Sequence, residues 1–404
     1  MKKLLSLLIS LIFFVWLVCN LIDRPLSADA ASFLTATAPP AAVEQNAVPA
    51  LPALIATVEN INEDDILECW LNDEAAHEGY APCLDSATLN ARLQSLSRPL
   101  TAYQAWLSHS RFSDTQGFLD FRGYILLRLS KYYNARNVLL VQQAQSEQAI
   151  QYWMAERQLI NKGLQDEASS TMRLILLSLS SYNLQSLEKM LRTDPAIAKT
   201  HGAMLNALLS DDGSARHEEI IKAVYRVEYK IIEDFIKNKA TWRTVLFYKS
   251  NHTANVMADY YGTIIDAAQA GPQKLGESLI TLKSEYKALL PDLSSPAYAL
   301  DLYSYNAVGK LLLGSALIGP ESSLLPLFWR QQAHRRALMT LIEAHAQDID
   351  AAEMPKFLQD VSARYPNPFN GASFAWDAAK GTIGYSVPDA YAPNDKVDYT
   401  LRYP

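Results

Sequence analysis

Apolar residues recur at three- and four-residue spacings through most of this chain, a pattern typical of amphipathic helices. The clearest stripe lies within 215–238, where it begins at Ile220, ends at Phe235 and follows turn formers at 211–214. Comparable patterns predict helices over 118–143, 147–162, 169–181, 184–192, 196–209, 271–289, 295–317, 326–347 and 355–364. The expected fold is mainly α: an irregular helical bundle or α-solenoid of about eleven or twelve helices.

Strand patterns occur only near the C-terminus. Residues 373–376 and 382–387 flank a connection that ends at Gly381, which predicts a β-hairpin. The alternating residues 399–403 are a candidate third strand. Because an isolated hairpin is marginal in water, we expect this tail to pack on the helices.

The N-terminus has a third pattern, an apolar run from Leu4 to Ile22 preceded by Lys2 and Lys3. At about 1.5 Å per residue the run covers roughly 28 Å, close to the hydrocarbon thickness of a bilayer. It predicts a membrane span over 4–22, and the lysines predict an N-in orientation. For a bacterial chain, this gives a single-pass inner-membrane protein with its C-terminal domain in the periplasm.

Two other interpretations of the leader stay open. Ala28-Asp29-Ala30 offers a small-x-small site, so cleavage near Ala30 would release a periplasmic or secreted protein. Lipid attachment at Cys19 would follow Val18, where a small residue is required. The length of the apolar run favours an uncleaved anchor, and all three interpretations export the body of the protein.

Composition divides the chain into four segments. Residues 1–27 form the signal-anchor or signal peptide, and 28–57 form an Ala/Pro-rich linker that we expect to be extended. Residues 58–365 form the helical domain, and 366–404 form the tail that packs on it.

Charge and cysteine content narrow the function. The net charge of −7 is spread along the chain without a large basic block, which argues against a nucleic-acid partner. Cys69 and Cys83 are the only cysteines after the leader, and in an oxidising compartment they should form a disulfide that contributes about 3 kcal/mol. A metal site that includes His77 between them lacks a fourth ligand.

The C-terminal residues resemble a known group of sequences. The resemblance rests on Met354-Pro355-Lys356-Phe357-Leu358, Tyr365-Pro366-Asn367-Pro368-Phe369-Asn370-Gly371 and Gly384-Tyr385-Ser386-Val387. These segments are similar to the end of uncharacterised exported bacterial α-helical proteins, which finish with a D-P-F-x-G turn and a Y-S-V strand. The pattern is also similar to the C-terminal hairpin of type II secretion pseudopilins. Asn367 stands where the pattern has Asp. The resemblance implies an exported helical protein with a β-hairpin tail, and it implies no activity.

No motif identifies a catalytic, cofactor-binding or metal-binding residue. Two S-x-x-K matches, at Ser186 and Ser284, lack the surrounding sheet that their serine chemistry needs. His217 directly precedes Glu218 and Glu219, and His345 lies two residues after Glu343, but neither has a second histidine four residues away.

Two clusters are weaker candidates for a site. His252 with Tyr260 and Tyr261 could line a polar pocket or form a half-buried cluster between helices. A second cluster, at 330–336, contains Arg330, His334, Arg335 and Arg336. It is expected to be a solvated helix face, with a docking patch for an acidic partner or glycan as the alternative.

The leading hypothesis is therefore a membrane-tethered periplasmic helical protein that acts as a binding or interaction module of the cell envelope. Its partner would be an envelope protein or a glycan. The alternative is a cell-envelope enzyme that acts on peptidoglycan through a site without a recognised motif.

Overall fold

The structure is a computed structural model. It describes residues 2–35, 45–58, 71, 85–113, 124–166, 168–211, 217–238, 241, 246–287, 305–317, 321–387 and 398–403. The chain divides into two compact units. Unit 1 comprises Met1–Pro39, Thr115–Gly117 and Ile221–Ser323, and unit 2 comprises Pro40–Asp114, Phe118–Ile220 and Leu324–Pro404. Each unit draws on separated stretches of sequence, so neither coincides with the single helical domain predicted over 58–365.

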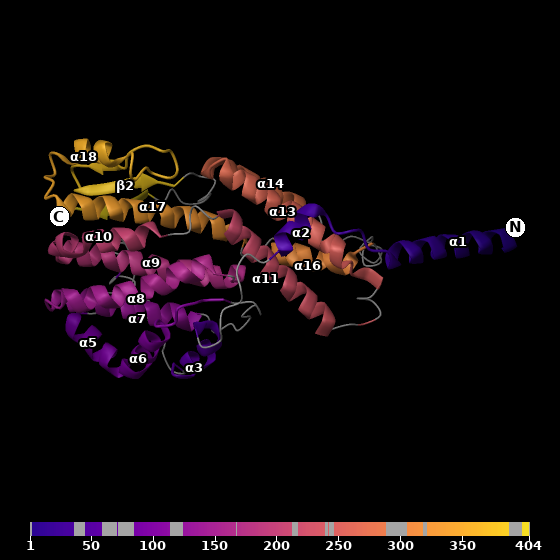
Figure 1. Cartoon of the computed structure of the whole chain (residues 1–404), viewed down its shortest axis with the longest axis horizontal. Helices are drawn as coiled ribbons and strands as arrows, with labels where there is room; N and C mark the ends of the chain where they lie inside the picture. Colours follow the sequence, from indigo (N-terminus) through magenta and orange to yellow (C-terminus); the bar gives the residue numbers. More distant parts are fainter. Residues whose placement is uncertain are drawn as a thin grey trace. The chain divides into compact units, whose positions relative to one another are not determined.

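Helices dominate the described residues, which confirms the mainly α prediction (Figure 1). The structure has 15 α-helices and one small antiparallel sheet in its described part. The number of helices exceeds the prediction partly because short helices form where the sequence predicts a linker.

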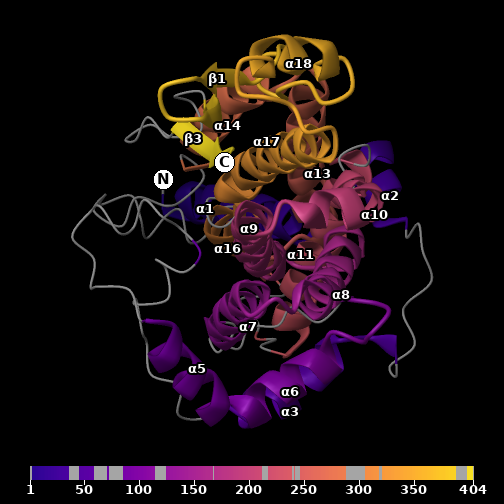
Figure 2. The same cartoon turned by 90° about the vertical axis from the view of Figure 1, so that its left-hand side faces the viewer.

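Unit 2 contains most of the helices. They are η2 (Val48–Ala50), α3 (Leu51–Ala56), α5 (Ser86–Ser95), α6 (Ser97–Trp106), α7 (Tyr124–Gln142), α8 (Ser146–Gln165), α9 (Ser170–Thr193), α10 (Ala196–Ser210), α17 (Glu321–Ala346, in this unit from Leu324) and α18 (Met354–Val361). Helices α7, α8 and α9 pack against one another, as Figure 2 shows with these helices nearly end-on. Their shared core includes Trp153, whose indole Nε1 donates to the Asn183 carbonyl at 2.7 Å.

Helix α9 is continuous where the sequence predicts two helices, over 169–181 and 184–192. Its polar run 180–183 contains no proline or glycine, and the buried Ser180 and Asn183 side chains have partners inside unit 2. Asn183, for example, donates from Nδ2 to the Trp153 carbonyl at 3.2 Å. Buried polar groups with such partners do not interrupt a helix, so the predicted break was wrong.

The C-terminal sheet confirms the predicted hairpin and its third strand. Strands β1 (Ala375–Asp377), β2 (Thr382–Ser386) and β3 (Asp398–Arg402) form an antiparallel sheet in the order β1-β2-β3. Asp377 Oδ1 accepts hydrogen bonds from the Ala379 and Lys380 amides, and Gly381 takes a φ of 62° at the end of the turn. The Tyr403 ring stacks on His345 of α17 at 4.6 Å between centroids, which attaches the sheet to the helices of unit 2.

The turn before the sheet explains why Asn367 can stand where the tail pattern has aspartate. Asn367 Oδ1 accepts from the Phe369 amide at 3.0 Å, and its carbonyl accepts from the Gly371 amide at 2.8 Å. An aspartate oxygen would make the same local hydrogen bond, because both side chains form turns of this kind. Asn367 therefore supplies the same local contact as the aspartate of the pattern.

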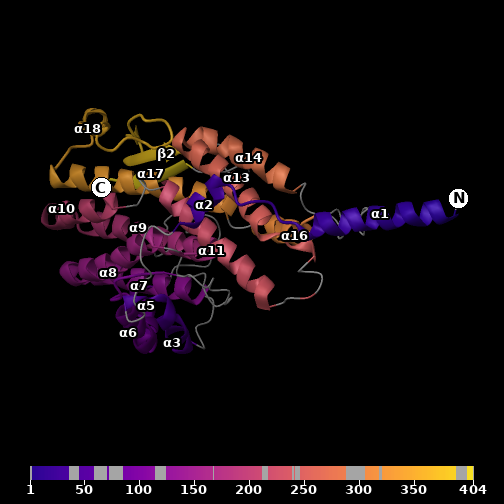
Figure 3. The ribbon, with the colours of Figure 1, turned by 45° about the vertical axis from the view of Figure 1, so that its right-hand side comes forward.

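Unit 1 is organised around one central helix. Its helices are α1 (Lys2–Leu21), α2 (Ala28–Leu34), α11 (His217–Asn238, in this unit from Ile221), α13 (Ser250–Gln269), α14 (Pro272–Lys287) and α16 (Ala307–Leu317). Helix α13 packs against α14, α2 and α16, and Figure 3 shows α13 and α14 side by side. No helix among the described residues is both long enough and apolar enough to cross a bilayer.

Part of the predicted extended linker, 28–57, is helical and packed. Ser27 begins α2 by accepting from the Ala30 amide at 3.1 Å, and Ala30 and Phe33 are buried. Farther along, Leu51 and Leu54 of α3 are buried in unit 2. The alanines favour helix, and Pro49 and Pro52 lie at first-turn positions that tolerate proline. Residues 36–44 of the predicted linker lie outside the described residues.

The segment between α1 and α2 is bonded to α13. Asp23 accepts through Oδ2 from the Asn251 amide at 2.8 Å and through Oδ1 from the His252 amide at 3.1 Å. Asn255 accepts from the Ser27 amide at 2.8 Å. We call residues 23–35 the strap, because these contacts attach the chain after α1 to α13.

Candidate functional site

Unit 2 contains a cavity of about 200 Å³ between two helices and the sheet. It is lined by Leu177, Ser178, Ser181 and Tyr182 of α9, by Leu327, Arg330, Gln331 and His334 of α17, and by Tyr385 of β2. The α17 residues are spaced by three and four positions, so they share one face of that helix. The Tyr385 hydroxyl donates to the Arg330 carbonyl at 3.5 Å, at the place where the sheet meets α17.

Gln331 in this lining is held in place by a hydrogen bond to α9. Its Nε2 donates to the Leu177 carbonyl, which orients the amide, and the residue is only 7 % exposed. Its Oε1 has no hydrogen-bond partner in the part of the chain that the structure describes. A buried acceptor without a partner costs about 1–3 kcal/mol of stability.

His334 supplies a neutral imidazole. Burial lowers its pKa to about 4, and the guanidinium groups of Arg157 and Arg335 act in the same direction. The nearest Glu188 carboxylate oxygen lies 3.9 Å from Nε2, beyond hydrogen-bond range, and does not offset these effects. At neutral pH the ring therefore has one donor nitrogen and one acceptor nitrogen.

The predicted solvated face at 330–336 was wrong. Arg335 is 2 % exposed, and His334 is largely covered. Arg336 donates from Nη1 to the Pro366 carbonyl at 2.9 Å, which joins α17 to the turn before the sheet. The cause is the C-terminal sheet and α9, which pack on this helix and cover what looks in sequence like a polar surface.

A second polar cluster is the buried Glu156 of α8. Its carboxylate accepts from the Tyr103 hydroxyl at 2.7 Å, Ser130 Oγ at 2.8 Å, Asn134 Nδ2 at 2.7 Å and Asn183 Nδ2 at 3.0 Å. Burial raises the pKa of Glu156, while these four hydrogen bonds lower it. The donors come from α6, α7 and α9, so the cluster joins four helices and has a structural role.

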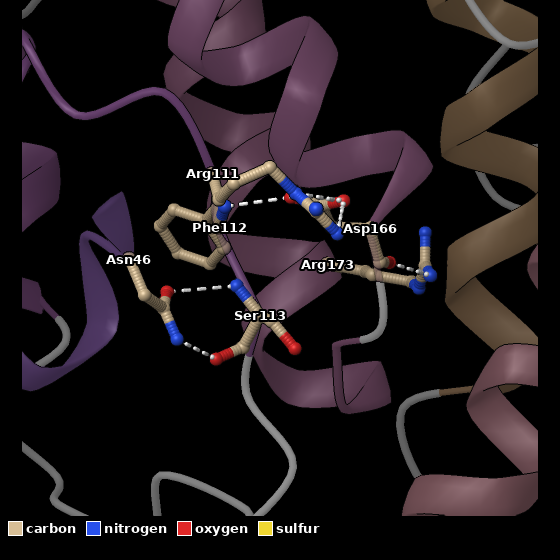
Figure 4. Close-up of polar contacts among 6 residues, drawn as sticks. All are labelled: Asn46, Arg111, Phe112, Ser113, Asp166 and Arg173. Atoms are coloured by element: carbon tan, nitrogen blue, oxygen red, sulfur yellow. Dashed lines mark hydrogen bonds and ion pairs between the residues drawn. The ribbon is translucent and has the colours of Figure 1, made fainter. Parts of the chain in front are cut away.

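The third cluster is a clamp at the end of α8 (Figure 4). Asp166 accepts from Arg111 Nε at 3.1 Å and from the Phe112 amide at 2.7 Å. Asn46 completes it by accepting from the Ser113 amide at 2.9 Å and donating to its carbonyl at 2.7 Å. These hydrogen bonds hold residues 111–113 between Asn46 and the end of α8. Asp166 therefore has a structural role.

The residues predicted as a site are not gathered into one. The structure places His252 in the first turn of α13, with its ring 5.3 Å from that of Tyr305. Burial lowers the pKa of His252, and Arg24 adds to this effect. Tyr260 and Tyr261 lie two turns farther along and are buried, with their rings in edge contact at 5.2 Å.

Cys69 and Cys83 lie outside the described residues, so their predicted disulfide stays a prediction. Within the described ranges, no group of three or more His, Cys, Asp or Glu side chains is placed to hold a metal ion. No protein-family model, curated protein or solved structure matches the chain.

Proposed function

We propose that this protein is a membrane-tethered binding module of the bacterial cell envelope. Helix α1 is the anchor through residues 4–22, its N-terminus lies in the cytoplasm, and the helical body lies in the periplasm. The observation that carries the proposal is the exposed apolar surface of α1. Phe13 and Phe14 are 60 % and 61 % exposed, and their neighbours Leu11, Ile12 and Val15 are also exposed. Soluble proteins rarely expose a contiguous apolar surface of this kind, whereas lipid tails would cover it.

The strap supports retention of this anchor. The potential cleavage site Ala28-Asp29-Ala30 lies within α2, where Ala30 is fully buried. Cleavage there would remove Asp23 and its hydrogen bonds to the first turn of α13. A leader that contributes to the fold favours a permanent anchor over a signal peptide that is removed.

The cavity between α9, α17 and β2 supports a binding role. Its lining combines an amide side chain, a neutral imidazole and several residues that carry hydroxyl groups, all in unit 2. Its occupant would be part of an envelope protein or a glycan. If the purified full chain instead turned over cell-wall glycan, the alternative of a peptidoglycan-acting enzyme would replace the binding role.

The topology is tested by fractionating a Gram-negative host that expresses the full chain. We expect it to stay in the membrane pellet after an alkaline carbonate wash, and its body to be digested by protease added to spheroplasts. The control replaces residues 2–22 with a cleavable signal peptide and should be soluble in the periplasm. A full chain recovered in the soluble fraction, or protected inside spheroplasts, would contradict the proposal.

A further inference from the structure

We infer that the folded body of unit 1 is itself a lipid-contacting surface, seated in the periplasmic leaflet of the bilayer around the second half of α1. This placement depends on the membrane anchor proposed above and adds a lipid contact that the body makes. The residues that carry it lie within 13–26, 246–252 and at Tyr305, and all of them belong to unit 1.

The exposure of α1 changes partway along the helix. Side chains from Leu11 to Val15 are exposed, whereas those of the next three residues, 16–18, are half-buried. On the covered side, the Trp16 ring lies 5.9 Å from the Phe247 ring between centroids, and Phe247 is itself buried. The folded body therefore packs against α1 from Trp16 onward.

The part of the apolar run before this contact is too short to cross a bilayer. From Leu4 to Val15 the helix rises about 18 Å, at about 1.5 Å per residue, whereas the hydrocarbon core is about 30 Å thick. The stretch from Trp16 to Ile22 adds about 9 Å. Because unit 1 is packed against that stretch, insertion of residues 4–22 brings the surroundings of Phe247 to the level of the periplasmic leaflet.

The side chains where the chain leaves this span suit a membrane interface. Leu21 and Ile22 are 57 % and 61 % exposed, and Leu26 is also exposed, so an apolar face stays open to lipid. Arg24 is exposed, and its guanidinium lies 5.8 Å from the centroid of the Tyr305 ring. Tyrosine and tryptophan are enriched where hydrocarbon meets headgroups, and a guanidinium pairs well with lipid phosphate.

The contacts on either side of Ile22 prevent the body from standing clear of the membrane. Asp23 directly follows the apolar run and accepts from the Asn251 and His252 amides of α13. Withdrawing the body from the leaflet would break these hydrogen bonds as well as the contact between Trp16 and Phe247. It would also leave the exposed apolar side chains in water.

The test is photo-crosslinking of the purified full chain, reconstituted in vesicles of phosphatidylethanolamine and phosphatidylglycerol. A benzophenone amino acid replaces one residue at a time, and mass spectrometry measures the fraction of the chain that gains a lipid adduct on irradiation. The two body positions are Leu246, a half-buried neighbour of Phe247, and Tyr305, also half-buried, where one aromatic group replaces another. Should one of these variants fail to fold, the other carries the test.

Two control positions calibrate the yield. Phe14, in the exposed part of α1, reports contact between the anchor and lipid. Tyr152 of α8 is half-buried like Tyr305, belongs to unit 2 and is not part of the proposed surface. We expect lipid adducts at Leu246 and Tyr305 in yields that approach the yield at Phe14 and exceed that at Tyr152 several-fold.

The outcomes separate the seat of the body from the anchor. Adducts at Phe14 but none at a folded body variant would overturn the inference and leave the anchor standing, because the bilayer would then thin around a short span. Equal yields at Tyr305 and Tyr152, or crosslinks from the body positions to a second copy of the chain in place of lipid, would overturn it too. Absence of adducts at Phe14 would reject the anchor and the inference together.

Discussion

Asp23 links the predicted anchor to the folded body, and its replacement by alanine tests that link. Helix α13 begins after Lys249, whose side chain makes no capping hydrogen bond, so Asp23 satisfies the Asn251 and His252 amides instead. Loss of a capping side chain costs about 0.5–2 kcal/mol, and loss of an anion at a helix N-terminus adds about 0.3–1 kcal/mol. We therefore expect Asp23→Ala to destabilise unit 1 by about 2 kcal/mol.

Hydrogen exchange of the first turn of α13, followed by mass spectrometry, measures this loss of stability directly. A loss of about 2 kcal/mol should speed exchange of the Asn251 and His252 amides roughly thirtyfold if local opening limits exchange. Asp23→Asn keeps one acceptor and should fall between alanine and wild type. The matched control is Asp29→Ala, an exposed aspartate in α2, which should change exchange there little. Equal exchange in wild type and Asp23→Ala would refute the strap as a structural element.

Three further predictions concern the interiors of the two units. Glu156→Ala leaves four buried donors without their acceptor and should lower the free energy of unfolding by about 3–5 kcal/mol in urea titrations. Gly309→Ala should destabilise unit 1 strongly, because its Cβ would clash with the buried side-chain amide of Asn306. Gly262→Ala, which meets nothing within 4 Å, should be stabilising by about 0.5–1 kcal/mol in thermal unfolding. Folding lowers the pKa of His334 and of His345 to about 4, so stability is full above about pH 6.5 and falls as pH drops toward 4. The free energies of unfolding at pH 7 and pH 5 should differ by about 2 kcal/mol for each histidine, and a variant with glutamine at both positions should lose less between these two pH values.

Local sequence signals predicted the elements that local chemistry determines. Helix α11 runs from His217 to Asn238, close to the predicted 215–238, because an uninterrupted apolar stripe follows a cluster of turn formers. The C-terminal hairpin was equally well predicted, since Gly381 and the alternating strands mark it directly. These features depend on residues that are neighbours in sequence.

Features that depend on distant residues were missed. The break predicted inside α9 did not form, because Glu156 on another helix satisfies Asn183. The linker prediction failed over α2, since Asn255 and other distant residues hold that segment in place. The cavity was missed although Arg330 and His334 had been singled out, because its other walls come from α9 and β2. Only the spacing of the α17 residues could have indicated a shared face.

The intact mass of the mature protein, purified from membranes, tests the central claim most directly. If α1 anchors the chain and the strap belongs to the fold, the mass should correspond to the whole 404-residue sequence, with or without its first methionine. A mass that lacks the residues up to Ala30 would contradict the account, because both the anchor and the Asp23 contacts would then be absent from the mature protein.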